Sequence, residues 1–163
     1  MRTIWVAVLL VMGCAKSAPP LTASVKMDTP RAVADGAMLA YKERNPKLAG
    51  TLLLSDELIK KHLECPDDSL VKRIATRRAK LDQEFGQPPA DTVIEIAGFD
   101  KLGSKEQQLR NGDAFEGCKA RGLIKSHNSR LELRLTKGEK AEFRDETWLF
   151  AQLGDDPTWY WVP

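Results

Sequence analysis

The stretch RLELRLTKGEKAEFRDETWLFAQL, residues 130–153, decides the fold of this chain. Leu131, Leu133 and Leu135 alternate with charged or polar residues, which is the period-two pattern of a strand with one buried face. Residues 137–140 (KGEK) supply a turn, and residues 141–153 follow as a long partner strand. The sequence therefore predicts a long antiparallel hairpin.

Further strands are predicted on both sides of this hairpin. Residues 92–97 (TVIEIA) have the composition of a strand, and residues 115–124 form a weaker candidate. After the turn GDDPT, residues 159–162 (WYWV) predict a short final strand. Together these segments predict an antiparallel sheet of four to five strands.

Three helices are predicted upstream of the strands. Each begins near an N-cap residue or a first-turn proline, and a proline or glycine ends it. They begin at Pro30, at Ser55 and at Asp68 or Ser69, and they end before Pro46, at Pro66 and at Gly86. Helices followed by an antiparallel sheet indicate an α+β fold.

The N-terminus carries an apolar run that abuts a cysteine. Residues 4–13 (IWVAVLLVMG) follow a single cation and are too few for a membrane span, which needs about 20 residues, but they fit a secretory signal. Residues 11–14 (VMGC) resemble the lipobox of bacterial lipoproteins. The resemblance implies cleavage before Cys14 and acylation of its thiol and amine, which anchors the chain in a membrane. A buried N-terminal helix and a plain secretory signal are the alternatives.

The lipoprotein interpretation divides the chain into three parts. Residues 1–13 are a signal peptide, residues 14–29 are the lipidated cysteine and a flexible tether, and residues 30–163 are a single α+β domain. In enteric lipoproteins an aspartate after the cysteine resembles an inner-membrane retention signal. Because Ala15 stands there, we expect attachment to the outer membrane of a bacterial cell envelope, with the domain in the periplasm or at the surface.

Composition excludes several classes of function. The chain has 163 residues and a net charge of +2, so it lacks the basic excess of a nucleic-acid-binding protein. The sequence contains no glycine-rich phosphate loop, nucleophile elbow or HExxH motif, and we expect no cofactor.

Two cysteines remain after Cys14. In an oxidising compartment, Cys65 and Cys118 predict a disulfide. The alternative is a metal site built from His62, Cys65, Cys118 and His127, the two histidines and the two remaining thiols. We favour the disulfide, because the ligand spacing is not that of a known zinc site.

The C-terminal segment TWLFAQLGDDPTWYWVP, together with the order of helices before strands, resembles the NTF2-like (cystatin-like) superfamily. The resemblance implies a long helix across a strongly curved antiparallel sheet that encloses a conical pocket. In the strand of residues 141–153, Phe143, Leu149 and Ala151 point one way whereas Trp148 and Phe150 point the other. Either both faces are covered, or a bulge near residues 145–147 shifts the phase.

In the phase of Phe143, Asp145 faces inward and becomes a candidate catalytic acid whose pKa burial would raise. A solvated acidic bend is the alternative for Asp145, and we favour it because no matching base lies nearby. The aromatic residues Trp148, Trp159, Tyr160 and Trp161 are candidates for ligand stacking, although core packing is the simpler interpretation. A basic run on the third helix, residues 72–80, is a solvated face or a docking face for an envelope partner or anionic lipid.

These features predict a cell-envelope lipoprotein whose domain binds a protein partner or a small apolar ligand without catalysis. One alternative is an NTF2-like pocket enzyme, a lyase or isomerase, that uses Asp145. Another is a structural or assembly factor of an envelope complex.

Overall fold

The computed structural model describes residues 25–87, 89 and 91–163. The predicted signal peptide, Cys14 and the first part of the predicted tether lie outside these residues. Within them, no helix combines the length and the apolar character that a membrane span requires.

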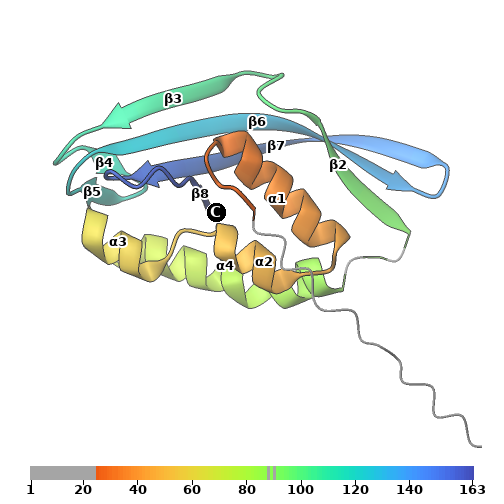
Figure 1. Ribbon diagram of the computed structural model, residues 1–163, viewed down its shortest axis with the longest axis horizontal. Coiled ribbons are helices and arrows are strands. Elements are labelled where there is room, and N and C mark those ends of the chain that lie inside the picture. Colours follow the sequence, from red (N-terminus) through yellow and green to blue (C-terminus); the bar gives the residue numbers. More distant parts are fainter. Residues whose placement is uncertain (1–24, 88, 90) are drawn as a thin grey trace, which may run out of the picture.

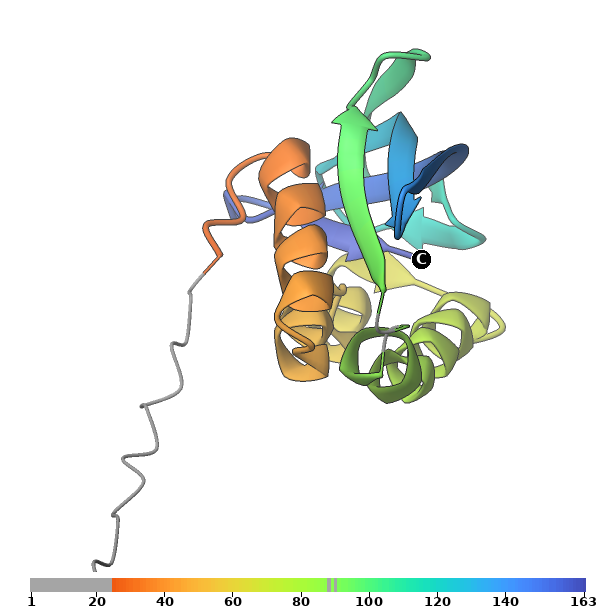
Figure 2. The ribbon, with the colours of Figure 1, turned by 90° about the vertical axis from the view of Figure 1, so that its right-hand side faces the viewer.

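The described residues form an α+β fold, as predicted, with four helices and eight strands (Figures 1 and 2). The helices are α1 (Pro30–Lys42), α2 (Pro46–Leu52), α3 (Asp56–His62) and α4 (Ser69–Gly86). The strands are β1 (Leu63–Glu64), β2 (Thr92–Gly98), β3 (Ser104–Leu109), β4 (Ala114–Phe115), β5 (Cys118–Ala120), β6 (Ile124–Lys137), β7 (Lys140–Leu153) and β8 (Tyr160–Val162).

The strands build two antiparallel sheets. The larger sheet has the order β2-β6-β7-β8, and β3 pairs with the other half of the β6 edge that β2 occupies. The smaller sheet has the order β1-β5-β4. Figure 1 shows the long β6–β7 hairpin above a layer formed by α2, α3 and α4, with β4 and β5 at one end.

The hairpin predicted from the sequence is the centre of the fold. β6 pairs with β7 from Ile124 opposite Leu153 to Lys137 opposite Lys140, without a register shift. The bulge considered for residues 145–147 is therefore not formed. The other alternative applies: both faces of β7 are covered at its C-terminal end, because Trp148 and Phe150 belong to one buried cluster and Ala151 and Leu153 to another.

The two clusters are packed against different elements. The first lies between the hairpin and the small-residue face of α1, where Val33, Ala34 and Ala37 are fully buried. The second lies among α3, the first half of α4 and the small sheet, and Ile59 and Ile74 are at its centre. The hairpin is thus shared by both halves of the core.

The packed chain begins before Pro30. Val25 and Met27 lie against the first cluster, and the Trp159 N–H donates to the Met27 carbonyl at 2.8 Å. Residues 25–29, which we assigned to the tether, therefore belong to the fold.

The predicted disulfide is confirmed. Cys65 and Cys118 are bonded, with Cα atoms 4.2 Å apart and a sequence separation of 53 residues. The bond joins the segment after β1 to β5, so it fastens the small sheet across the second cluster.

Candidate functional site

Helix α1 forms one wall of a groove on the side of the domain. Thr29 caps its first turn, since the Thr29 side chain accepts a hydrogen bond from the Ala32 N–H at 3.1 Å, and Pro30 occupies the first helical position. Its alanine-rich face is buried in the core. The longer side chains of α1, Arg31, Asp35, Met38 and Lys42, are left to line the groove.

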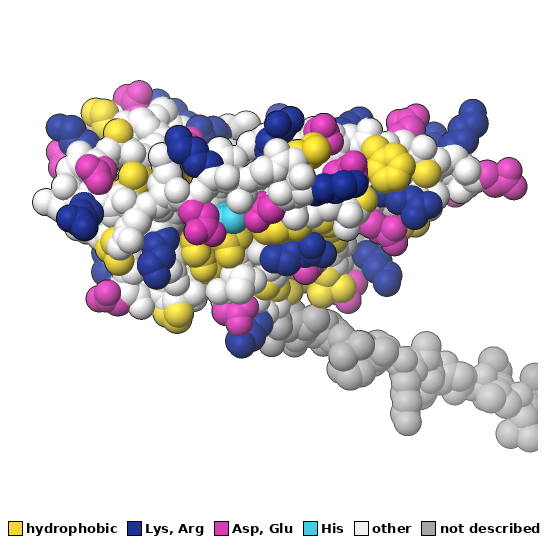
Figure 3. Space-filling model, turned by 90° about the horizontal axis from the view of Figure 1, so that it is seen from above, with side chains coloured by type: hydrophobic (Ala, Val, Ile, Leu, Met, Phe, Trp, Pro, Cys, Tyr) yellow, Lys and Arg dark blue, Asp and Glu magenta, His cyan; other side chains and the backbone are white. Residues whose placement is uncertain are grey.

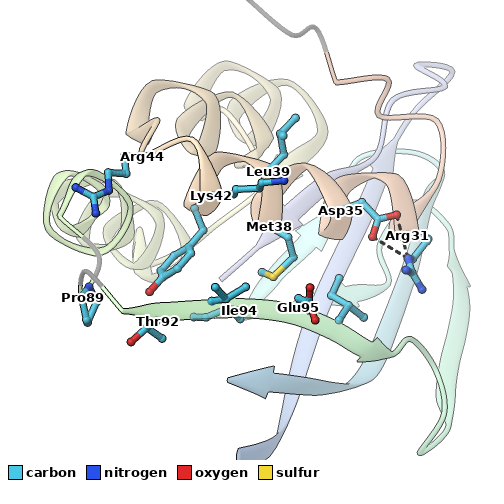
Figure 4. Close-up of a pocket in the computed structure, with 13 residues that line it drawn as sticks. Arg31, Asp35, Met38, Leu39, Lys42, Arg44, Pro89, Thr92, Ile94 and Glu95 are labelled. Carbon is cyan, nitrogen blue, oxygen red and sulfur yellow. Dashed lines mark hydrogen bonds and ion pairs between the residues drawn. The ribbon is translucent and has the colours of Figure 1, made fainter. Parts of the chain in front are cut away.

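Strand β2 forms the opposite wall. Its alternating exposure places Ile94 and Ile96 toward the core and leaves Val93 and Glu95 exposed, with Val93 55% accessible. Among the described residues β2 pairs with β6 alone, so its other backbone edge carries no strand. That edge follows α1, which runs antiparallel to β2 in Figure 4.

The groove between α1 and β2 has a volume of about 500 Å³. Met38 and Ile94 approach each other across it in Figure 4, and Tyr41 adds an aromatic ring. Burial raises the pKa of the Tyr41 hydroxyl, so the phenol stays protonated at neutral pH and is available as a hydrogen-bond donor. The groove therefore offers an apolar floor with a polar donor at its edge.

The two ends of the groove differ in charge. At one end Arg31 pairs with Asp35, with Nε 2.9 Å from Oδ1, so these charges are already neutralised. At the other end Lys42 is the last residue of α1, and Arg44 lies beyond it toward Pro89 (Figure 4). Both cations are exposed, as are their neighbours in the chain Glu43 and, next to Thr92, Asp91. Glu43 and Asp91 are not among the residues that line the groove, so its lining at the Thr92 end is positive.

A histidine cluster fixes the far end of β2. His127 of β6 is buried, and its ring nitrogens lie 3.0 Å from Asp100 Oδ2 and 3.1 Å from Glu106 Oε1. Ser129 donates to Asp100, and Phe99 stacks parallel to the His127 ring with centroids 5.8 Å apart. Figure 3 shows this charged face of the molecule, on which a histidine lies between acidic side chains.

This cluster connects the β2–β3 loop to the groove. Asp100 adopts a left-handed backbone conformation with φ of 57°. This conformation is strained for an L residue, so it persists only where surrounding contacts offset the conformational free energy. The Arg31 guanidinium lies 5.5 Å from the centre of the Phe99 ring. The cluster therefore anchors the end of β2 beside the start of α1 and holds the groove walls in place.

No protein family, curated protein sequence or solved structure matches this chain. The resemblances to bacterial lipoproteins and to the NTF2-like superfamily stay predictions.

Asp145, the candidate catalytic acid, is exposed on β7. Phe143 shares its face of the strand and is 63% accessible, so at this end of β7 the face points to solvent and not into a pocket. The inward orientation considered for Asp145 is therefore not found. Its carboxylate is solvated, as in the interpretation that we favoured, although no bulge forms there. Burial of β7 begins further along the strand, where Trp148 and Phe150 on one face and Ala151 and Leu153 on the other are buried.

The aromatic candidates are mostly core residues. Trp148 and Trp161 stack with centroids 4.6 Å apart and are 8% and 4% accessible. The Arg77 guanidinium lies 4.7 Å from the Trp161 ring centre. These neighbours cover one face of each ring, and the two tryptophans also line a shallow hollow of about 720 Å³ beside Arg77 and Tyr41. Trp159 and Tyr160 are half-buried and pack against the first and second clusters, respectively.

The alternative metal site is not formed. The disulfide consumes Cys65 and Cys118, and His127 is held by Asp100 and Glu106. The described residues contain no group of three or more side chains arranged to hold a metal ion. At His62, burial and the neighbouring Lys61 lower the pKa of the ring, which favours its neutral form.

The basic run on α4 is largely engaged within the domain. Arg73 pairs with Glu116 at 2.6 Å, Arg77 with Glu84 at 2.8 Å and Arg78 with Asp56 at 2.7 Å. These pairs connect α4 to neighbouring elements or to its own last turns. The run therefore offers less free positive charge to a partner than its sequence suggests.

The groove was not predicted from the sequence. Met38 and Tyr41 recur with Val33 and Ala37 at helical spacing, which indicates a buried stripe, and Ile94 belongs to a predicted strand. The available signal was the mostly apolar stretch VIEI in a short strand. The contact between α1 and β2 joins segments 50 or more residues apart in the chain, so it has no local signature.

Proposed function

We propose that this chain is a cell-envelope lipoprotein, anchored through Cys14, whose α+β domain is a non-catalytic binding module. The observation that supports binding is the groove between α1 and β2, which combines an apolar floor with charged ends. Concave sites of this size with a few polar groups are the usual places for ligands and peptide segments.

Catalysis has less support than binding. An acid–base enzyme needs a desolvated acid or base within reach of a second polar group, and Asp145 is solvated on the outer face of β7. The assembly-factor alternative relied on the basic face of α4, and three of those arginines already have acidic partners. The groove remains the surface with the best physical case for binding.

Binding in the groove is tested with the fluorescent amphiphile 1-anilinonaphthalene-8-sulfonate. We expect one bound dye per chain, and we expect Met38→Glu to weaken its affinity at least tenfold, because a carboxylate on the groove floor repels the sulfonate and disfavours burial of the apolar rings. Leu102→Glu is the matched control, since Leu102 is an exposed apolar residue in the β2–β3 loop. Equal affinity in the two variants would place the dye elsewhere and remove the support for this proposal.

The anchor is tested by the intact mass of the protein extracted from its native membrane. We expect a chain that begins at Cys14 and carries acyl groups, with a mass that Cys14→Ser returns to that of an unacylated form. A mature chain that retains residues 1–13, or that begins elsewhere without lipid, would refute the lipoprotein assignment.

A further inference from the structure

The edges of the five-stranded sheet differ in how they are protected. Sheets expose unpaired backbone groups at their edges, and proteins cover such edges or place charged residues on them. The edge at β8 is covered, because Leu53 bridges to Trp161 and the Leu54 N–H donates to the Trp161 carbonyl at 3.1 Å. The edge at β3 is polar, with Lys105 and Glu106 among its exposed residues.

Within the described part of the chain no strand pairs with the outer edge of β2, and the groove separates this edge from α1. Its sequence is apolar and β-branched at Val93, Ile94 and Ile96, with Glu95 as the one charge between them. Residues 92–96 all line the groove, although side chains of consecutive residues point to opposite faces of a strand. Since their side chains alternate, the feature that all five residues share at the groove is the backbone edge of β2.

The charges at the ends of the groove give a bound strand a direction. A strand that adds antiparallel to β2 ends its own chain beside Thr92, where β2 begins. Arg44 lies toward that end and Lys42 is the last residue of α1, whereas Arg31 at the other end is paired with Asp35 (Figure 4). In the antiparallel orientation, the C-terminal carboxylate of a bound peptide lies near these cations. In the parallel orientation, it lies near Arg31, whose charge Asp35 already neutralises.

From these observations we infer that the groove binds the C-terminal end of an extended peptide, which adds to β2 as an antiparallel strand. Alternate apolar side chains of the peptide face Met38 and Tyr41, and its carboxylate lies between Lys42 and Arg44. Backbone hydrogen bonds supply affinity in such strand addition, and the side-chain contacts supply specificity. The inference rests on the proposed binding function and specifies the partner of the same groove.

A peptide library tests this inference on the full-length chain. The probe is a library of random heptapeptides that carry fluorescein at the N-terminus and end in a free carboxylate, screened by fluorescence anisotropy. We expect the tightest peptides to have apolar residues at alternate positions, and amidation of their C-termini to weaken binding at least tenfold.

N-methylation of the peptide backbone tests strand pairing directly. In an antiparallel strand, alternate N–H groups point to the neighbour and the others point away. Methylation of one alternate set of amides should weaken binding at least tenfold, and methylation of the other set should change it less than threefold.

Charge removal on the protein tests the carboxylate contact. The double variant Lys42→Gln, Arg44→Gln should weaken the free-acid peptides at least tenfold and leave their amides within threefold. The matched control is Lys60→Gln, Lys61→Gln, which removes two cations from the last turn of α3 and should leave both peptide forms unchanged.

Three results would overturn the inference. Equal binding of both N-methylated sets would show that a peptide in the groove does not pair with β2, and it would leave the proposed binding function standing. Failure of every peptide, with dye binding still sensitive to Met38→Glu, would point to a small ligand. Self-association of the chain that Val93→Lys abolishes would assign the β2 edge to a second copy.

Discussion

Removal of the disulfide should lower the free energy of unfolding by roughly 4 kcal/mol, the value that the chain-entropy model gives for a loop of 53 residues. The bond restricts the unfolded chain, and in the folded chain it holds β5 beside the segment that follows β1. The small sheet offers few other restraints, because β1, β4 and β5 have only two or three residues each.

The test is urea denaturation of Cys65→Ala, Cys118→Ala beside the oxidised and the reduced natural chain. Alanine is preferred to serine because Cys118 is 2% accessible, and a buried hydroxyl without a partner adds a cost of its own. The double variant and the reduced chain should agree, and both should unfold well below the oxidised chain. Agreement of all three midpoints would mean that the disulfide does not contribute to stability.

The elements predicted correctly are those with strong local signals. The β6–β7 hairpin follows from leucine alternation and the KGEK turn, and α3 and α4 follow from their start and stop residues. Helix α2 was missed because Pro46 was used only as a breaker. In the structure Pro46 also begins the next helix, and the Asn45 side chain caps it by accepting from the Leu48 N–H at 3.0 Å.

Strand β3 was missed for a different reason. Its sequence, SKEQQL, has no apolar alternation, and pairing with β6 along Ser104–Leu109 is the contact that defines it. The weak strand predicted at residues 115–124 is instead split among β4, β5 and the start of β6, with Gly117 at φ of 81° in the turn between β4 and β5. The pairing of β3 with β6 has no local signature, whereas β4 and β5 form a short local hairpin that interrupts the predicted strand.

The site was harder to predict than the fold. The disulfide followed from cysteine number and compartment, whereas the histidine cluster needs Asp100, Glu106 and His127 to converge from two strands and a loop. From the sequence, His127 was only a candidate metal ligand. Its carboxylate partners lie 21 and 27 residues away in the chain, so nothing near His127 in the sequence pointed to them. Polar clusters of this kind become visible only with the strand register.

The second large effect on stability is expected at β7, because two phenylalanines of this strand lie in opposite environments. Phe150 is fully buried, and its ring lies 6.2 Å from the Phe99 ring, 6.3 Å from the Trp148 ring and 6.5 Å from the His127 ring. Phe143 is 63% accessible. Phe150→Ala should therefore cost about 3–5 kcal/mol of unfolding free energy through lost burial and a cavity, and Phe143→Ala should change it by less than about 0.5 kcal/mol.

Urea denaturation of the two variants measures this difference, with the disulfide intact in each. Phe150→Leu, which keeps most of the apolar volume, should fall between the alanine variants and serves if Phe150→Ala does not fold. Asp145 lies two residues from Phe143 on the same face of β7. The comparison therefore also tests whether Asp145 is solvated, which is the argument against a catalytic role. Equal losses at Phe143 and Phe150 would mean that Phe143 is buried as well, and they would return Asp145, on the same face as Phe143, to the interior.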